Sequence, residues 1–573
     1  MNALDYLKLA SRISETDRGR FPSTISVNII TNFTDDVFLK VLTGICLENS
    51  IYPVIWRAPY KQYHLAFKSG EIPKDVAITF IFFYLNPYLY SEFYNPDQVN
   101  ELFDDIEKFA ESTKGTVVMN SFITPYRGAY GNLFDKSELF SLAENYNRSL
   151  FELEKRLKNF RVLDVNRLMH TLGERQARDF RGMYAFDFPF TNDFAVEVAK
   201  EWFSYIRVLL GKIKKCIVVD LDDTVWGGIL GEVGPLGILL GEDYPGRCYQ
   251  NFQRALVEFH NRGILLAINS RNNWEDVKEV FNQNPHMVLK ESHFASIQTN
   301  WNNKADNLRA IAEELNIGLD SFVFFDDDPN NRALVKTMLP EVLVPEFSIA
   351  PEEYVNMLYG LDEFNQFALT EEDTARAKMY AEERQRKVVE KGSASFDEYI
   401  AGLQIVVNVS VNKLEYLTRL SQLTLKTNQF NLTTKRYSES EVADLIKKGC
   451  RFFAGDIQDK FGRYGVTILA ILSPQENGVV RIDNFLMSCR VAGRGVEFTF
   501  FDYLLELLAS EGVKKVTGLL IETQKNPPVR EILPNLGFKI KEKGEGGTLF
   551  EINLEEYQMC QQPNVNRHIK IGS

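Results

Sequence analysis

The stretch Lys214-Lys-Cys-Ile-Val-Val-Asp-Leu-Asp-Asp-Thr-Val-Trp-Gly-Gly228 determines the fold that we predict for the centre of this chain. Cys216–Val219 is a short apolar run, typical of a strand buried on both faces of a parallel sheet. Asp220 and Asp222 follow it, and functional groups in open α/β sheets lie at the carboxyl ends of the strands. Two such carboxylates repel each other unless a cation binds, and hard oxygen ligands suit Mg²⁺.

Two further apolar runs end in polar groups of the same kind. Gly263-Ile-Leu-Leu-Ala-Ile-Asn-Ser270 ends in a hydroxyl, and Ser321-Phe-Val-Phe-Phe is followed by Asp326 and Asp327, while Lys304 opens a helical run over Lys304–Leu315. Each of these groups alone fits an ordinary structural role, such as a capped loop, a solvated lysine or a satisfied strand-end hydroxyl. Together they favour phosphoryl transfer, in which a metal and a lysine neutralise the transferring group.

The order of these elements resembles the haloacid dehalogenase-like phosphohydrolases, and Asp220-Leu-Asp-Asp-Thr224 fits the D-x-D-x-T pattern of that family. The resemblance implies that Asp220 is the nucleophile that forms an aspartyl-phosphate, and that Asp222 is the general acid and base. It implies that Ser270 and Lys304 hold the phosphate. For the Mg²⁺ ligands it implies the four carboxylates Asp220, Asp222, Asp326 and Asp327.

The spacing of these motifs limits what can cover the site. Asp220 and Ser270 are 50 positions apart, and Ser270 and Lys304 are 34 apart. A separate cap domain needs ~50 residues or more by itself, and the expected helices and strands already use much of both gaps. We therefore expect an open site, suited to a substrate that another protein or a neighbouring domain presents.

A second motif lies near the C-terminus, where Arg490, Gly493 and Gly495 form R-x-x-G-x-G before a predicted helix over Val496–Ser510. Glycines at a strand-to-helix turn expose backbone N–H groups that suit a phosphate. With the segment Asn526–Phe538, this motif resembles GNAT-type acetyltransferases. Leu533 stands where that pattern often has a proton-donating tyrosine, which favours pantetheine binding over amine acetylation. The predicted pantetheine- or acyl-binding residues are Cys489, Arg490, Gly493, Arg494, Gly495 and Asn526.

Two roles are open for Cys489. A thiolate is the form that accepts an acyl group, so Cys489 is a candidate relay between an acyl phosphate and a carrier protein. The alternative is a buried strand-end thiol with a packing role only. Cys216 lies inside a predicted strand and is expected to be a small core residue.

Five segments together closely resemble the FkbH-like proteins, over about residues 20 to 555. They are Asp220–Gly234, Ser270–Asn273, Phe324–Arg332, Leu423–Tyr437 and Ser488–Glu497. The resemblance implies that the chain takes 1,3-bisphosphoglycerate, transfers the glyceryl unit to the phosphopantetheine thiol of an acyl carrier protein, and removes the phosphate. The rival interpretation is a Mg²⁺-dependent phosphatase and acyltransferase of another pathway, such as surface-polysaccharide modification. A non-catalytic scaffold is disfavoured by the intact D-x-D-x-T.

The fold class predicted from these motifs is α/β with three domains. We expect an SGNH-like α/β sandwich over residues 1–208, a capless haloacid dehalogenase-like Rossmannoid domain over 209–363, a helical linker over 364–399, a GNAT-like α+β domain over 400–558 and a loose tail over 559–573. The first block has Asn28-Ile-Ile-Thr-Asn-Phe-Thr-Asp-Asp36 where SGNH hydrolases have G-D-S, and Asp187–Asp193 lacks their histidine. We therefore expect a docking or structural role there, without hydrolase activity.

Composition excludes several classes of protein. The 573 residues carry a net charge of −13, which disfavours duplex nucleic-acid binding. Six cysteines without a C-x-x-C pair disfavour a disulfide scaffold or a structural zinc site. The first residues have no apolar signal region, and the most apolar run, Val76–Leu85, is too short to span a bilayer. We therefore expect a cytoplasmic protein without nucleic-acid or membrane partners.

Overall fold

The computed structural model describes residues 2–12, 15–86, 92–124, 129–347, 350–369, 386, 393–475, 478–544, 546–558 and 565–569. By its internal contacts the chain divides into two compact units, one of Met1–Leu210 with Tyr437–Asp444 and one of Gly211–Arg436 with Leu445–Ser573. Within the described ranges, no helix has both the length and the apolar character needed to cross a membrane.

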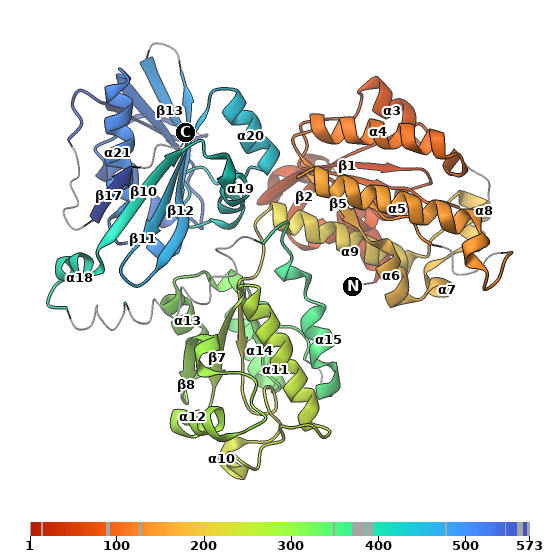
Figure 1. The fold of residues 1–573 in the computed structure, drawn as a ribbon, viewed down its shortest axis with the longest axis horizontal. Helices are drawn as coiled ribbons and strands as arrows, with labels where there is room; N and C mark the ends of the chain where they lie inside the picture. Colours follow the sequence, from red (N-terminus) through yellow and green to blue (C-terminus); the bar gives the residue numbers. More distant parts are fainter. Residues whose placement is uncertain are drawn as a thin grey trace. The chain divides into compact units, whose positions relative to one another are not determined.

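The first unit contains a five-stranded sheet whose strands are all parallel, in the order β2-β1-β3-β4-β5 (Figure 1). Its strands are β1 (Ser23–Thr31), β2 (Ile51–Arg57), β3 (Ile78–Phe82), β4 (Thr116–Asn120) and β5 (Phe160–Leu163). All five residues of β3 and all five of β4 are buried, as expected of a parallel sheet covered on both faces.

Helices cover both faces of this sheet, and each face has its own apolar core. On one face, Trp202 of α9 stacks on Phe80 of β3 with ring centroids 4.7 Å apart. This arrangement is the α/β sandwich predicted for the first block; its likeness to SGNH hydrolases stays a prediction. The helices are α1 (Ala3–Ser11), α2 (Asp36–Glu48), α3 (Tyr63–Ser69), α4 (Pro96–Ser112), α5 (Glu138–Arg156), α6 (Val165–Leu172), α7 (Glu174–Ala177), α8 (Phe180–Phe186) and α9 (Asn192–Leu209).

The second unit contains two sheets. The smaller one, called here the central sheet, is parallel with the order β8-β7-β6-β9. Its strands are β6 (Cys216–Val219), β7 (Leu265–Ser270), β8 (Phe294–Thr299) and β9 (Phe322–Phe325). The sequence analysis did not predict β8, whose burial alternates as in a half-exposed strand. The helices are α10 (Leu230–Val233), α11 (Gly246–Asn261), α12 (Trp274–Gln283), α13 (Lys304–Leu315), α14 (Pro329–Met338) and α15 (Tyr354–Tyr359).

The larger sheet has eight strands in the order β15-β16-β14-β13-β12-β11-β10-β17 and mixes parallel and antiparallel pairs. The strands are β10 (Ile405–Val411), β11 (Arg451–Gln458), β12 (Arg463–Pro474), β13 (Val479–Met487), β14 (Lys515–Leu520), β15 (Lys539–Gly544), β16 (Gly547–Asn553) and β17 (Val565–Ile569). The helices of this part of the chain are α18 (Phe396–Leu403), α19 (Leu417–Lys426), α20 (Glu439–Lys447), α21 (Val496–Ser510) and α22 (Ile532–Asn535).

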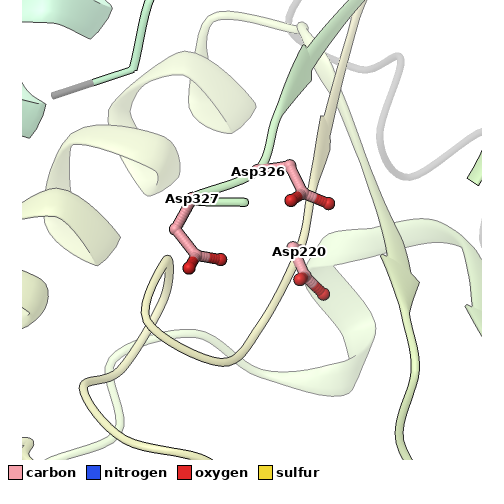
Figure 2. A group of neighbouring side chains, drawn as sticks. All are labelled: Asp220, Asp326 and Asp327. Carbon is pink, nitrogen blue, oxygen red and sulfur yellow. The ribbon is translucent and has the colours of Figure 1, made fainter. Parts of the chain in front are cut away.

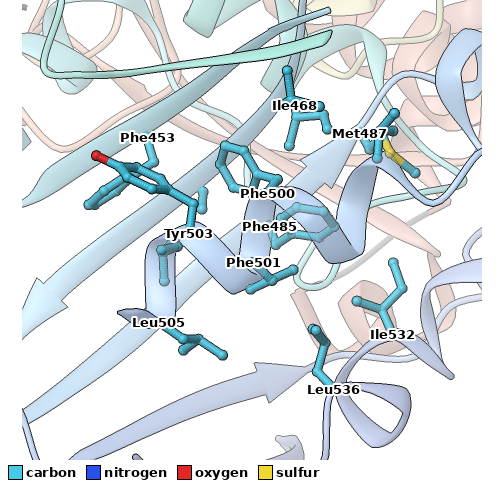
Figure 3. Packing of buried hydrophobic residues seen from close by; sticks show 14 of the residues in the cluster. Phe453, Ile468, Phe485, Met487, Phe500, Phe501, Tyr503, Leu505, Ile532 and Leu536 are labelled. Atoms are coloured by element: carbon cyan, nitrogen blue, oxygen red, sulfur yellow. The ribbon is translucent and has the colours of Figure 1, made fainter. Parts of the chain in front are cut away.

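Helix α21 supplies the centre of the apolar core of this sheet, and its buried aromatic residues lie over the strands (Figure 3). Phe501 packs on Phe485 of β13 with ring centroids 4.6 Å apart. β13 and β14 are parallel neighbours in the sheet, and α21 connects them. The start of α21 therefore lies at the carboxyl end of β13.

One expectation about the C-terminus is wrong. We expected residues 559–573 to be a loose tail, but Val565–Ile569 forms β17, which pairs in parallel with β10 at the edge of the sheet. The exposed edge of β10 offers unpaired backbone groups, and Val565 is buried in the apolar core, so even a short polar segment can add a strand there. Most of the helical linker expected over residues 364–399 lies outside the described residues, which in this range are 364–369, 386 and 393–399.

Candidate functional site

Three carboxylates meet at the carboxyl ends of β6 and β9. Asp220 follows β6, and Asp326 and Asp327 follow β9, which is its parallel neighbour. One oxygen from each residue lies within 4.8 Å of the others, and Figure 2 shows the three side chains around a common point. Parallel pairing of the two strands therefore brings together three of the four predicted metal ligands.

The chemistry of this group fits a divalent cation. Burial and the neighbouring charge of Asp220 raise the pKa of Asp326, and the same causes raise the pKa of Asp327 to about 7. Oδ1 of Asp220 is buried and accepts no hydrogen bond. Three carboxylates this close repel one another, and hard oxygen donors of this kind are the ligands that Mg²⁺ prefers, so these three residues are suited to hold it.

Lys304 lies between two of these carboxylates. Its Nζ is 2.9 Å from Oδ1 of Asp220 and 3.1 Å from Oδ2 of Asp326, and its side chain is only 1% exposed. The contact with Asp220 is an ion pair without the alignment of a hydrogen bond. Oδ1 of Asp220 therefore has a charged neighbour but no hydrogen-bond donor. Nζ also donates to the carbonyl of Asn269 at 2.7 Å. A buried lysine at this place can neutralise a bound phosphoryl group.

Helix α13 begins at Lys304, as the sequence predicts, because Asn303 caps its first turn by accepting from the backbone N–H of Asp306. Asn269 donates back to the carbonyl of Lys304, and Asn307 donates to Asn269. These buried amides fix the first turn of α13 against the end of β7, and the sequence analysis gave them no role.

Asp222 faces a different set of groups from the other carboxylates. Its Oδ1 accepts from Nε1 of Trp226 at 2.9 Å and from the backbone N–H of Leu230 at 3.1 Å, and its Oδ2 accepts from Nδ2 of Asn272 at 3.0 Å. Burial raises the pKa of Asp222 despite these hydrogen bonds. The side chain is not in the group of three that can hold a metal, so its predicted place among the metal ligands stays a prediction.

Asn272 connects Asp222 to Ser270. Its Nδ2 donates to Oδ2 of Asp222 and also to Oγ of Ser270, at 3.1 Å. The predicted acid–base residue and the predicted phosphate-holding hydroxyl are therefore joined by one buried amide. Asn272 belongs to the motif Ser270–Asn273, but no role was predicted for it. The feature of the sequence that could have indicated a role is its position two residues after the strand-end hydroxyl of Ser270.

No cap domain covers this site within the continuously described residues 129–347. The first gap is occupied by α10, α11 and β7, and the second by α12 and β8. The two gaps therefore hold no separate cap domain, while the side chains of Lys304, Asp220 and Asp326 are 1%, 12% and 0% exposed. Ile229, Tyr244 and Trp301 are large apolar side chains in these two gaps, and they are 46%, 73% and 78% exposed.

Five of the six predicted pantetheine- or acyl-binding residues, all except Asn526, lie on what we call the glycine loop, Ser488–Gly495, between β13 and α21. Gly493 and Gly495 have φ of 76° and 75°, a conformation that glycine adopts without strain. Arg494 is buried and donates to Oη of Tyr464 and to the carbonyl of Arg490, both at 2.7 Å. This guanidinium therefore supports the loop from within.

Cys489 and Asn526 also have structural partners. The side chain of Cys489 packs beside the apolar core on one face of the central sheet. Asn526 is fully buried, and its Nδ2 donates to the carbonyls of Asn431 and Ile521. Cys216 is buried in β6, and burial raises the pKa of its thiol, in keeping with the predicted core role.

Comparisons with known proteins bear mainly on about two thirds of the chain. No protein-family model and no curated protein matches it. Among solved structures, the N-terminal part of a Bacteroides fragilis protein, described as containing a phosphatase domain complexed with Mg, is 26% identical with a TM-score of 0.58. That alignment covers 64% of this chain and 100% of that one.

Two further structures match a smaller share. A GNAT-family acetyltransferase from Staphylococcus aureus is 10% identical with a TM-score of 0.22, over 26% of this chain and 99% of that one. A domain from Methanocaldococcus jannaschii is 15% identical with a TM-score of 0.22, over 26% of this chain and 97% of that one. Scores this low do not assign a fold, so the acetyltransferase likeness stays a prediction.

Proposed function

We propose that the chain is a Mg²⁺-dependent phosphatase of the haloacid dehalogenase-like type that is coupled to acyl transfer. The observation that carries the phosphatase proposal is the contact of Lys304 with both Asp220 and Asp326, beside the Asp222–Asn272–Ser270 connection. The phosphatase domain and the Mg described for the Bacteroides fragilis neighbour support it.

In the proposed reaction, a carboxylate oxygen of Asp220 attacks phosphorus, and the bond from phosphorus to the leaving oxygen breaks. Asp222, protonated at this stage, gives its proton to the leaving oxygen. In the second step Asp222 takes a proton from water, which attacks the aspartyl-phosphate and releases inorganic phosphate and free Asp220. Ser270 and Lys304 hold the other phosphoryl oxygens. Mg²⁺ bound at Asp220, Asp326 and Asp327 would neutralise charge on the phosphoryl group.

For the substrate, we propose 1,3-bisphosphoglycerate and the phosphopantetheine thiol of an acyl carrier protein. The thiol attacks the acyl carbon, the bond from carbon to the phosphate oxygen breaks, and phosphate leaves. The phosphatase site then hydrolyses the remaining phosphate ester. The absence of a separate cap domain within residues 129–347 supports a substrate carried on another protein.

The test is to incubate the full chain with Mg²⁺, 1,3-bisphosphoglycerate and a holo carrier protein, and to measure the intact mass of the carrier. The expected result is a carrier that gains one glyceryl unit without phosphate. With Asp220→Asn as the matched enzyme, the carrier should gain the glyceryl unit with its phosphate still attached. Robust phosphatase turnover with no mass gain on the carrier would instead favour the polysaccharide-type alternative.

A further inference from the structure

A cavity of about 930 Å³ lies in the second unit, at the opposite end of the central sheet from the three carboxylates. Lys215 stands just before β6, Leu265 begins β7 and Ser321 stands just before β9, and all three line it. The other wall includes residues 488–490 of the glycine loop. The volume is within the range of ~300–1,000 Å³ that is usual for small-molecule sites.

The charged residues of the lining point to an anion. Five are cationic and two are acidic, although the whole chain carries −13. The cationic residues are Lys215, Arg419, Lys426, Arg490 and Lys525, and the acidic ones are Asp320 and Glu341. Lys525 forms an ion pair with Asp320. A concave surface with this excess of positive charge attracts phosphate or carboxylate groups.

The backbone of β13 does not offer an alternative place for an extended ligand. β12 pairs with one edge of β13, and the other edge, beyond its short pairing with β14, is covered by the segment 430–432. Leu432 donates to the carbonyl of Phe485, and Met487 donates to the carbonyl of Phe430, both at 2.9 Å. An extended ligand therefore cannot pair with the backbone of β13 near the glycine loop.

Helix α13 connects the two ends of the central sheet. Lys304, its first residue, contacts Asp220, and Asn316, its C-cap, donates from Nδ2 to the carbonyl of Cys489 at 2.9 Å. Twelve helical residues span about 18 Å. The helix that presents the phosphatase lysine thus also holds the glycine loop at its other end.

We propose that this cavity is a second ligand site for a molecule bearing a phosphate group, and that the central sheet completes it through Lys215 and Asn316. Lys215 supplies positive charge from the sheet side, and Asn316 positions the glycine loop. The proposed function supplies two candidates for this ligand, a phosphopantetheine arm and a phosphorylated three-carbon acyl donor. The proposal rests on the proposed function for these two candidates only.

The test is calorimetric titration of the full chain, in EDTA, with coenzyme A and separately with 3-phosphoglycerate. Lys215→Met should weaken binding of whichever of the two molecules occupies the cavity by about tenfold. This is the loss expected when a charge-assisted contact is removed. Asn316→Gly should weaken binding about threefold. Glycine suits the φ of 50° at Asn316, so this variant removes the side-chain donor without straining the helix end.

The control is Lys278→Met, which removes an exposed lysine on α12 and should leave binding unchanged. If coenzyme A shows this pattern, the phosphate comes from a pantetheine arm; if 3-phosphoglycerate shows it, from the acyl donor. The proposal is overturned if neither molecule binds, or if Lys215→Met and Asn316→Gly leave the affinity unchanged. If the unaltered protein shows this pattern of binding but has no phosphatase activity, only the proposed function is overturned.

Discussion

The ammonium group of Lys304 lies 2.9 Å from Oδ1 of Asp220, and each of the two residues is placed by a different kind of element. Asp220 follows a buried strand and Lys304 begins a helix capped by Asn303. In the proposed reaction, this distance is short enough for Lys304 to hold the phosphoryl group that Asp220 attacks.

Asp220→Asn should abolish phosphate release from p-nitrophenyl phosphate, because an amide is a poor nucleophile. The side chain keeps its shape, so the unfolding temperature should change little. The matched control is Asp223→Asn at the neighbouring aspartate, whose φ of 50° asparagine tolerates. Turnover retained by Asp220→Asn would contradict the assigned nucleophile.

Asn272→Ala should lower kcat about tenfold, since losing one positioning hydrogen bond of ~1.4 kcal/mol has that effect on a rate. Asn272→Asp should lower kcat further, because its carboxylate faces Oδ2 of Asp222 where the amide donated. Asn273→Ala is the control: Asn273 caps α12, so this change should cost about 1 kcal/mol of stability and leave kcat unaltered. Equal kcat values for Asn272→Ala, Asn272→Asp and Asn273→Ala would contradict the positioning role of Asn272.

EDTA should stop turnover and added Mg²⁺ should restore it. Asp327→Asn should raise the Mg²⁺ concentration for half-maximal activity about tenfold or more, because it removes one of three charged ligands. Asp328→Asn, next in the chain, changes a residue that caps α14 and should leave the Mg²⁺ dependence as in the unaltered protein. Activity that EDTA does not affect would exclude the carboxylate–metal site.

Unfolding at mildly acidic pH should report on the histidine pair His260 and His293, which lies outside the catalytic motifs. Burial, with the charges of His260 and Lys290, lowers the pKa of His293 to about 4. A lowered folded-state pKa means that stability is present above the unfolded value of ~6.5 and falls as pH drops towards 4. His293→Asn should flatten the fall of the unfolding temperature over this range, whereas the exposed His170→Asn should not. Identical slopes in both variants would contradict this assignment.

Much of the phosphatase site could be predicted from the sequence because its signals are local. Helix α13 spans Lys304–Leu315 and α21 spans Val496–Ser510, both as predicted, since capping residues and glycines mark their ends. Parallel strands ending in Asp220, Ser270 and Asp326 share one sheet edge, so their convergence followed from topology. The predicted domain boundaries stay predictions.

Other features depend on tertiary contacts that no local pattern reports. Asn272 has a role only because Oδ2 of Asp222, in the loop that follows β6, lies 3.0 Å from its Nδ2. The cavity forms where the amino-terminal ends of the central strands meet a loop from a different sheet, and β17 forms only because β10 leaves an edge free. None of these partners is near in sequence.

The most direct measurement uses the intact mass of Asp222→Asn after incubation with acetyl phosphate and Mg²⁺. The acetate leaving group needs no proton, so Asp220 should still be phosphorylated, while hydrolysis of the intermediate lacks its base and should slow at least about a hundredfold. The account predicts that the chain gains one phosphoryl group, located by peptide mapping at Asp220, and that Asp220→Asn combined with Asp222→Asn gains none. An unphosphorylated chain, or a phosphoryl group at another residue, would contradict it.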